Sequence, residues 1–300
     1  MTDDPGKILL ELYEADQEKW FDDRALGTLF DPPFVGVASA DDPWFARFKE
    51  IIGDFYWTPQ EALALVAPLG RARSVISWCL PKAEVARVTN RRQTQVPSRE
   101  WAYVRTFGEE FLNRLRRGME ARLRTLGFAA LAPAIAPQND VQVRPGVGLS
   151  SRWSERHTAF VAGLGTFGIS GGLITRRGIA HRLGSVVTDA PLAATPRPYG
   201  DDAFAWCLKL ARGTCGKCIE RCPAGSIGPT IQARDKDACV KHYHETAYKK
   251  CRPVYGWDGV YGCGLCQTAV PCESRNPTEK GGAVEAGAAA HAAPRLRAPA

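Results

Sequence analysis

Long apolar runs are missing from this 300-residue sequence. No stretch approaches the roughly 18 consecutive apolar residues that a membrane-spanning helix needs. The N-terminus, MTDDPGKILLELYEAD, lacks the basic and then apolar regions of a secretory leader, and the RR pairs lie too far along the chain for a twin-arginine signal. We therefore expect a cytoplasmic protein that does not enter a membrane.

Disulfide bonds are also not expected, because the cytoplasm keeps thiols reduced. The ten cysteines therefore need another role, and nine of them fall between Cys207 and Cys272. The remaining one, Cys79, lies in the apolar stretch RSVISWCLP. We interpret it as a buried core residue without chemistry.

The composition is that of a soluble globular protein, with 45% hydrophobic and 24% charged residues. The net charge of +7 favours anionic partners, such as an acidic small molecule, an acidic redox protein or RNA. Lysine and arginine occur in short clusters rather than in a tail, which is typical of a solvated surface.

The cysteine distribution divides the chain into three parts. Residues 1–200 are expected to form a mixed α/β domain, residues 201–280 a cysteine-dense domain, and residues 281–300 an Ala-, Gly- and Pro-rich disordered tail. Apolar periodicity predicts helices at 7–20, 60–68 and 99–126 and strands at 34–39, 74–80, 129–135 and 184–189. Their alternation indicates a layered fold of the α/β or α+β class.

The run Cys215-x2-Cys218-x3-Cys222-Pro is typical of bacterial ferredoxins, and a second C-x2-C pair follows at Cys263 and Cys266. Zinc sites use separated C-x2-C pairs and do not need the C-x3-C-P ending. The pattern therefore favours [4Fe–4S] clusters over zinc or isolated thiols.

In two-cluster ferredoxins the cysteine before proline ligates the other cluster. By this rule the first cluster takes Cys207, Cys215, Cys218 and Cys272, and the second takes Cys222, Cys239, Cys263 and Cys266. Cys251 is left over, and it could replace Cys207 or Cys239 or be an ordinary thiol.

The stretch AGLGTFGISGG at 162–172 matches G-x-G-x-x-G, and Asp189 follows about twenty residues later. A dinucleotide fingerprint needs a strand before it and a helix after it. Here a helical pattern precedes the glycines, and Gly171 and Gly172 disfavour a helix after them. The loop therefore predicts either a close approach to a flat cofactor or a plain series of turns.

Six short runs follow one another between about residues 150 and 275: ERHTAFVAGLGTFG, LIT, GSVVTD, CGKC with CP, DKDAC and YGC-x2-CQ. In their order and spacing they resemble the epoxyqueuosine reductase family. That family is related to the reductive dehalogenases. The resemblance implies a core of the nitroreductase and B12-processing type with a C-terminal ferredoxin-like module of two [4Fe–4S] clusters. It also implies a base-off cobalamin beside the clusters and an external low-potential electron donor of the ferredoxin or flavodoxin type.

The resemblance further implies that the glycine loop and its neighbours line the corrin. These residues are Trp153, Ala162, Gly163, Leu164, Gly165, Gly168, Leu173, Ile174, Thr175, Ser185 and Val186. For Trp153 an ordinary core position is the alternative. The sequence has no D-x-H-x-x-G motif, so no histidine ligand to the corrinoid is predicted.

One departure concerns the aspartate that the family uses as proton donor, whose place near Gly148 and Leu149 carries no acid. The candidates are Glu155, Arg156, Asp140 and Tyr103, followed by Arg105 and His157. For each of them a salt bridge or helix cap is the competing interpretation.

Four functions follow as hypotheses. The first is a corrinoid-dependent reductase of a small organic molecule or modified nucleoside. The second is an iron–sulfur electron carrier, and the third is a protein that reduces or delivers cobalamin without its own substrate. The fourth is a tRNA epoxyqueuosine reductase, whose tRNA binding would be salt-sensitive.

Overall fold

The computed structural model describes residues 4–144 and 148–279, and the tail expected at 281–300 lies outside these residues. The helices are α1 (Pro5–Ala15), α2 (Pro43–Ile52), α3 (Pro59–Ala64), α4 (Glu84–Arg91), α5 (Arg99–Thr125), α6 (Glu155–Val161), α7 (Leu208–Arg212), α8 (Lys217–Glu220), α9 (Lys236–His242) and α10 (Lys249–Tyr255). A π-helical turn, Tyr243–Tyr248, joins α9 to α10.

A four-stranded sheet in the order β1-β2-β8-β3 forms the centre of the core. Its strands are β1 (Phe34–Ser39), β2 (Ser74–Pro81), β3 (Ala130–Leu131) and β8 (His181–Thr188). Every neighbouring pair is antiparallel. The core is therefore of the α+β type, without the parallel crossovers of a dinucleotide-binding fold.

Most of the predicted elements are confirmed, with three corrections. The helix expected at 60–68 is α3, which ends at Ala64. The helix expected at 7–20 ends at Ala15, because Asp16 caps a separate 3₁₀ turn. The strand expected at 129–135 is wrong beyond Leu131: Pro133, which has no N–H to donate to a ladder, opens a 3₁₀ turn there.

Every residue of β2 is buried, because helices cover both faces of the sheet. Alternate side chains of a strand point to opposite faces, so Ile76, Trp78 and Leu80 face one apolar cluster while Val75 and Cys79 face the other. The expectation that Cys79 is a core residue is confirmed.

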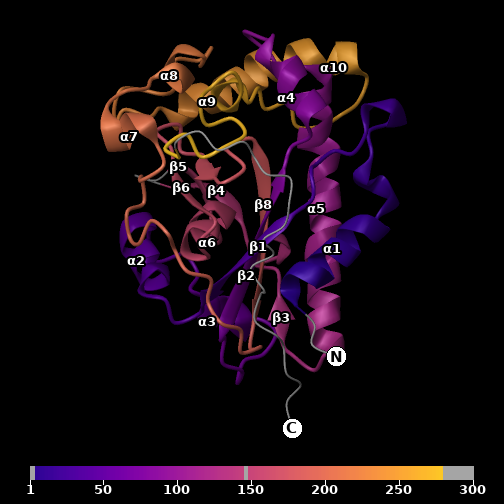
Figure 1. The fold of residues 1–300 in the computed structure, drawn as a ribbon, viewed down its shortest axis with the longest axis vertical. Coiled ribbons are helices and arrows are strands. Elements are labelled where there is room, and N and C mark those ends of the chain that lie inside the picture. The colour runs from indigo at the N-terminus through magenta and orange to yellow at the C-terminus, as the bar shows by residue number, and fades with distance from the viewer. Residues whose placement is uncertain (1–3, 145–147, 280–300) are drawn as a thin grey trace.

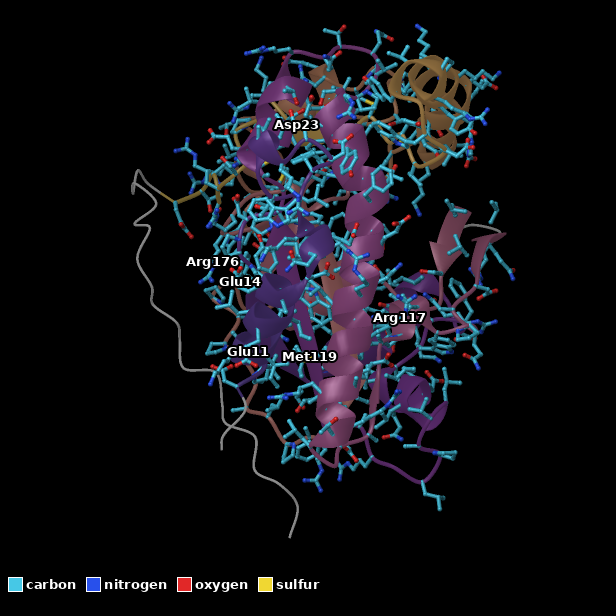
Figure 2. The ribbon with its side chains drawn as sticks, turned by 90° about the vertical axis from the view of Figure 1, so that its right-hand side faces the viewer. Glu11, Glu14, Asp23, Arg117, Met119 and Arg176 are labelled. Atoms are coloured by element: carbon cyan, nitrogen blue, oxygen red, sulfur yellow. The ribbon has the colours of Figure 1, made fainter. Side chains whose placement is uncertain are left out.

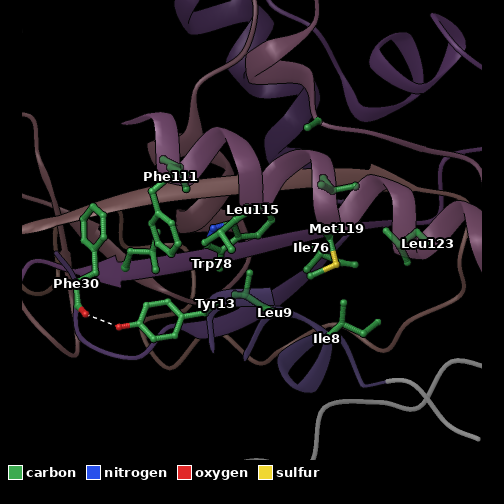
Figure 3. Packing of buried hydrophobic residues seen from close by; sticks show 14 of the residues in the cluster. Ile8, Leu9, Tyr13, Phe30, Ile76, Trp78, Phe111, Leu115, Met119 and Leu123 are labelled. Atoms are coloured by element: carbon green, nitrogen blue, oxygen red, sulfur yellow. Dashed lines mark hydrogen bonds between the residues drawn. The ribbon is translucent and has the colours of Figure 1, made fainter. Parts of the chain in front are cut away.

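Helices α1 and α5 cover the first face (Figure 1). Figure 3 shows Leu9 and Tyr13 of α1 packed toward Leu115 of α5, and the Tyr13 hydroxyl donates a hydrogen bond of 2.6 Å to the Phe30 carbonyl. Helix α5 runs along most of the molecule, and in Figure 2 Arg117 and Met119 mark its C-terminal half. The second face is covered by α2, α3 and α6.

The glycine run lies in a short hairpin, not in a strand–helix turn. Helix α6 precedes it, and β6 (Gly165–Phe167) pairs antiparallel with β7 (Leu173–Thr175). The prediction that the surrounding elements do not make a dinucleotide fingerprint is therefore confirmed. A second hairpin, β4 (Val141–Arg144) with β5 (Gly148–Ser151), projects from the core.

Residues 201–279, here called the cysteine module, lie over one end of the sheet (Figure 1). Within this described stretch the module consists of short helices and loops without strands, so the predicted ferredoxin-like fold is not confirmed. Two backbone hydrogen bonds join it to the core just before β8: Ile179 N–H donates to Cys272 O, and Ala180 N–H donates to Glu273 O.

Candidate functional site

Four cysteines from three segments line one cavity between the module and the β6–β7 hairpin. They are Cys207, Cys215, Cys218 and Cys272, the set expected for the first cluster. The cavity is partly open to solvent. This arrangement brings together thiols that are up to 65 residues apart in the chain.

The thiols of this cavity lie close enough to influence one another's titration. Burial, followed by the nearby Cys207 and Cys215, raises the pKa of Cys218 to about 11. Burial and then the nearby thiols raise the pKa of Cys272 to about 12. Thiolates gathered in this way repel one another until a metal neutralises them, and metal binding would release their protons.

The second predicted set also groups in space. Burial raises the pKa of Cys263 to about 11, and its neighbouring thiols Cys239 and Cys222 act in the same direction. Burial also raises the pKa of Cys266, with contributions from Cys263 and Cys239. Asn90 of α4 fixes this group to the core, since its Nδ2 donates 3.1 Å to the Cys263 carbonyl.

Cys251 lies apart from both sets. It is buried against Ala102, Ala247 and Tyr261 in an aromatic cluster under α10. Burial raises the pKa of Cys251, and the groups that oppose this shift are Tyr255 and Lys250, neither of which is a cysteine. The geometry therefore favours the ordinary-thiol interpretation over a ligand role.

Within residues 4–144 and 148–279, no three His, Cys, Asp or Glu side chains lie close enough to hold a single metal ion. A cube presents four separate irons to its four thiolates, so its ligands are spaced more widely than those around one ion.

The glycine-rich stretch has two parts with different surroundings. Ala162 and Leu164 are buried in the core, and Gly163 ends α6 with a positive φ of 79°. A Cβ on Gly165 would lie 2.1 Å from the Ile174 carbonyl oxygen. These glycines are explained by chain packing.

The later part faces the cysteine cavity, which Gly168, Ile169, Ser170 and Ile174 line. Leu173 and Thr175 alternate with Ile174 on β7 and are buried in the core. Of the predicted corrin-lining residues, the structure thus brings Gly168 and Ile174 to the thiols and leaves the others in the interior.

Glu155 belongs to a closed hydrogen-bonded network inside the core. Its carboxylate forms a salt bridge of 3.0 Å with Arg116 and accepts 2.6 Å from the Ser185 hydroxyl. The Ser185 hydroxyl in turn accepts from the Trp153 indole at 2.9 Å. Burial raises the pKa of Glu155, while Arg116 opposes the shift. Every partner is satisfied, so this geometry is that of a structural network.

Trp153 is sandwiched between Phe45 and Tyr56, and Val186 is completely buried in the opposite cluster. Both side chains are surrounded by protein. The core interpretation, which the sequence left as an alternative for Trp153, is the one that fits this geometry.

The other proton-donor candidates lie at separate places. Asp140 forms salt bridges with Arg144 and Arg152 beside the β4–β5 hairpin. Tyr103 packs against Phe21 and Trp257 on the outer side of α5.

Arg156 and His157 lie closer to the glycine hairpin. The Arg156 guanidinium donates to the Gly171 carbonyl. The Nδ1 of His157 shares a hydrogen bond of 2.7 Å with the Ser154 hydroxyl, and burial lowers the pKa of this imidazole to about 3. His157 is therefore neutral at pH 7.

Sequence reasoning missed a group of cations at the module-facing end of the sheet. Lys82 follows directly after β2, and Arg182 lies on the adjacent β8. The side chains of His181 and Arg182 each carry a buried nitrogen without a hydrogen-bond partner, namely His181 Nδ1 and Arg182 Nε. The feature of the sequence that could have revealed this group is Lys82, a lysine at the end of an otherwise apolar strand.

Comparisons with known proteins agree with the resemblance. No family model matches the sequence. An epoxyqueuosine reductase from Synechocystis sp. is 31% identical over 136 residues, which are 42% of this chain and 41% of that relative. The resemblance to epoxyqueuosine reductases that the motifs predict is confirmed over this stretch.

Two solved structures share the fold at a TM-score of 0.50. One is an epoxyqueuosine reductase with an epoxyqueuosine-modified tRNA stem loop, 18% identical, with 90% of this chain and 66% of that chain covered. The other is a catabolic reductive dehalogenase in complex with 3-bromo-4-hydroxybenzoic acid, 15% identical, with 91% of this chain and 36% of that chain covered.

The chain thus spans less than two thirds of the length of these relatives. In the described residues, no helix is both long and apolar enough to cross a membrane.

Proposed function

We propose that this chain is an iron–sulfur oxidoreductase in which two [4Fe–4S] clusters deliver electrons to a base-off corrinoid. Its substrate would be a small organic molecule or a modified nucleoside. The observation that carries the proposal is the cavity in which Cys207, Cys215, Cys218 and Cys272 meet the glycine hairpin.

The donor chemistry fits the clusters. Each cysteine set supplies four sulfur ligands, the number that a [4Fe–4S] cluster takes. The first set lies beside Gly168 and Ile174, so a group bound against the hairpin would be next to a cluster.

The same end of the core also fits a polar cofactor or substrate. The unpartnered His181 Nδ1 and Arg182 Nε are polar atoms that a buried site normally satisfies. The Leu173 carbonyl accepts from His181 Nε2, so a ligand bound between the hairpin and the end of β8 would donate to His181 Nδ1 and accept from Arg182 Nε. When bound, a corrinoid would supply the reactive cobalt centre, and the protein would supply position and protons.

The chain's own residues have defined tasks in this proposal. The hairpin backbone orients the cofactor, since glycine at position 168 leaves its approach open. Arg156 holds the hairpin through the Gly171 carbonyl and presents a cationic donor beside it. Glu155 is held in its ion pair with Arg116, so we assign it a positioning role.

The first test is anaerobic reconstitution of the full chain with iron and sulfide, followed by addition of cob(II)alamin. We expect about eight irons per chain, the number for two cubes, and the EPR signal of base-off cob(II)alamin beside reducible clusters. Reducible clusters without corrinoid binding would refute the reductase and leave an electron carrier. Corrinoid reduction without turnover of any added substrate would favour a cobalamin-handling protein.

A second candidate is tRNA epoxyqueuosine reduction. The sequence match to the Synechocystis enzyme and the net charge of +7 favour it. The missing acid at Leu149 counts against it, because that position carries an apolar side chain on β5. Conversion of an epoxyqueuosine-containing tRNA, with binding that weakens steeply as salt rises, would support this function. Corrinoid loading without conversion would exclude it.

A further inference from the structure

Three cations, Lys82, Arg105 and Arg182, gather between α5, the end of the sheet and the Cys263 loop; we call them the cation cluster. Lys82 is only 2% exposed, and its ammonium lies 3.6 Å from the centroid of the Trp101 ring. The side chains of Arg105 and Arg182 are 30% and 23% exposed. A buried lysine side chain therefore lies beside two arginines that solvent can reach.

The cluster has too little negative charge around it. Glu109 forms ion pairs with both arginines, but it also pairs with Arg116 at 3.0 Å. No carboxylate among the described residues forms an ion pair with Lys82, whose only close partner is an aromatic face. The Nε of Arg182 is buried without an acceptor.

Neighbouring groups do not correct this imbalance. Lys82 faces Arg182 and Arg105, and burial with these two like charges lowers its pKa well below the ordinary value. Burial lowers the pKa of Arg105, and the Tyr243 phenol of the module acts in the opposite direction. A phenol is neutral at pH 7 and cannot replace a carboxylate.

Uncompensated buried cations destabilise a fold unless an anion accompanies them. Arginine guanidinium groups suit the oxyanions of phosphate and carboxylate, to which they donate two parallel hydrogen bonds. We propose that the cation cluster is an oxyanion subsite, in which Arg105 and Arg182 contact a phosphate or carboxylate and Lys82, buried beside them, becomes charged when the anion binds.

The subsite itself does not depend on the proposed function, whereas the source of the oxyanion does. If the proposed function holds, the group is either the phosphate of the corrinoid's nucleotide loop or an acidic group of the substrate. The phosphate and the acidic group of the substrate would each offer the arginines negatively charged oxygens that accept hydrogen bonds.

The first experiment titrates inorganic phosphate into the cluster-reconstituted full chain, with chloride at matched ionic strength as reference. We expect phosphate to raise the melting temperature of the wild type in a concentration-dependent way. Lys82→Met and Arg182→Gln should each weaken phosphate binding by about tenfold, the loss expected for one charge-assisted hydrogen bond. Lys7→Met, which removes an exposed lysine of α1, should leave binding unchanged.

Lys82→Met also separates this role from a structural one. Without phosphate, the variant should melt at a higher temperature than the wild type, because it loses a buried amino group that has no carboxylate partner and keeps the apolar stem against Trp101. Wild-type phosphate affinity in Lys82→Met, or no phosphate effect in the wild type, would overturn the proposal. If Lys82→Met does not fold, Arg105→Gln is measured in the same titration.

The second experiment compares cobalamin with cobinamide, which lacks the nucleotide loop and its phosphate. Tighter binding of cobalamin, with the preference lost in Lys82→Met, assigns the subsite to the cofactor. Equal binding of both corrinoids, with phosphate still bound at saturating cobalamin, assigns it to the substrate. If neither corrinoid binds while phosphate does, the proposed function fails and the oxyanion subsite stands.

Discussion

The α/β core and the cysteine module differ in what they bury. Helix α5 buries a row of apolar side chains against the sheet, including Phe111, Leu115 and Leu123. In contrast, α7, α8 and α9 contain no buried residue. Apolar burial therefore holds the core together, whereas in the module it is limited to small clusters such as that of Ala247, Cys251 and Tyr261. If the cysteines bind clusters, we expect the rest of the module to depend on them for its stability.

The largest expected difference between the two regions is their response to iron removal, which should destabilise the cysteine module and not the core. We expect a chelator, or Cys218→Ser, to abolish cluster-one absorption and to unfold the module around the cysteine cavity, while the core keeps its structure. Hydrogen exchange would measure this as lost protection at residues 201–279 and retained protection in α5 and β2. Loss of protection throughout the chain would show that the core also depends on the clusters.

Within the core, the substitution expected to reduce the free energy of unfolding most is one that breaks the Glu155–Arg116 pair. Arg116→Met leaves a buried carboxylate without its partner, which typically costs about 3–5 kcal/mol. The free energy of unfolding from denaturant titration checks this value, and Arg117→Met on the exposed side of the same helix is the matched control.

The stability that Arg116→Met loses should also depend on pH. Burial raises the pKa of Glu155 above its ordinary 4.5, and Arg116 opposes that shift. Without Arg116 the pKa in the folded protein rises further above that of the unfolded chain. The destabilisation should therefore be small at pH below about 4.5 and grow as the pH rises through the folded-state pKa. A pH-independent loss would contradict the assignment to this carboxylate.

A smaller loss of stability is expected from substitutions in the glycine run, and it should differ between Gly165 and Gly168. Gly165→Ala places a methyl group against the Ile174 backbone, which should cost about 1–3 kcal/mol by overpacking. Gly168→Ala meets nothing closer than 3.4 Å, so the fold should tolerate it. Thermal melts of the two variants test whether the first glycines serve packing. Equal losses would mean that the whole run is structural.

The smallest effect should come from Cys251→Ser. Because Cys251 lies outside both cysteine sets, the variant should keep the wild-type iron content and lose about 1 kcal/mol at most from its buried position. Iron analysis checks this, with Cys207→Ser as the contrasting variant. A cluster lost from Cys251→Ser would reverse the choice between these two cysteines.

The sequence predicted the elements that depend on local pattern. The strands at Phe34–Ser39 and Ser74–Pro81 and the long helix at Arg99–Thr125 follow from apolar periodicity and are confirmed. Helix α4 and the two hairpins were missed. Helix α4 is eight residues long and carries no side-chain cap, and β6 and β7 are three residues each. Segments this short give little periodic signal.

By itself the sequence predicted the two local ligand runs, Cys215-x2-Cys218-x3-Cys222-Pro and Cys263-x2-Cys266, because such spacing is a local property of the chain. It left open whether Cys207, Cys239 or Cys251 completes the sets. It could not decide which glycines pack and which face the thiols, since the same residue type serves both tasks and only the neighbours differ. Only the tertiary structure placed Glu155 in a satisfied pair with Arg116 while leaving Lys82 without a carboxylate. Charge balance inside a protein depends on which distant side chains meet, and chain folding alone brings them together.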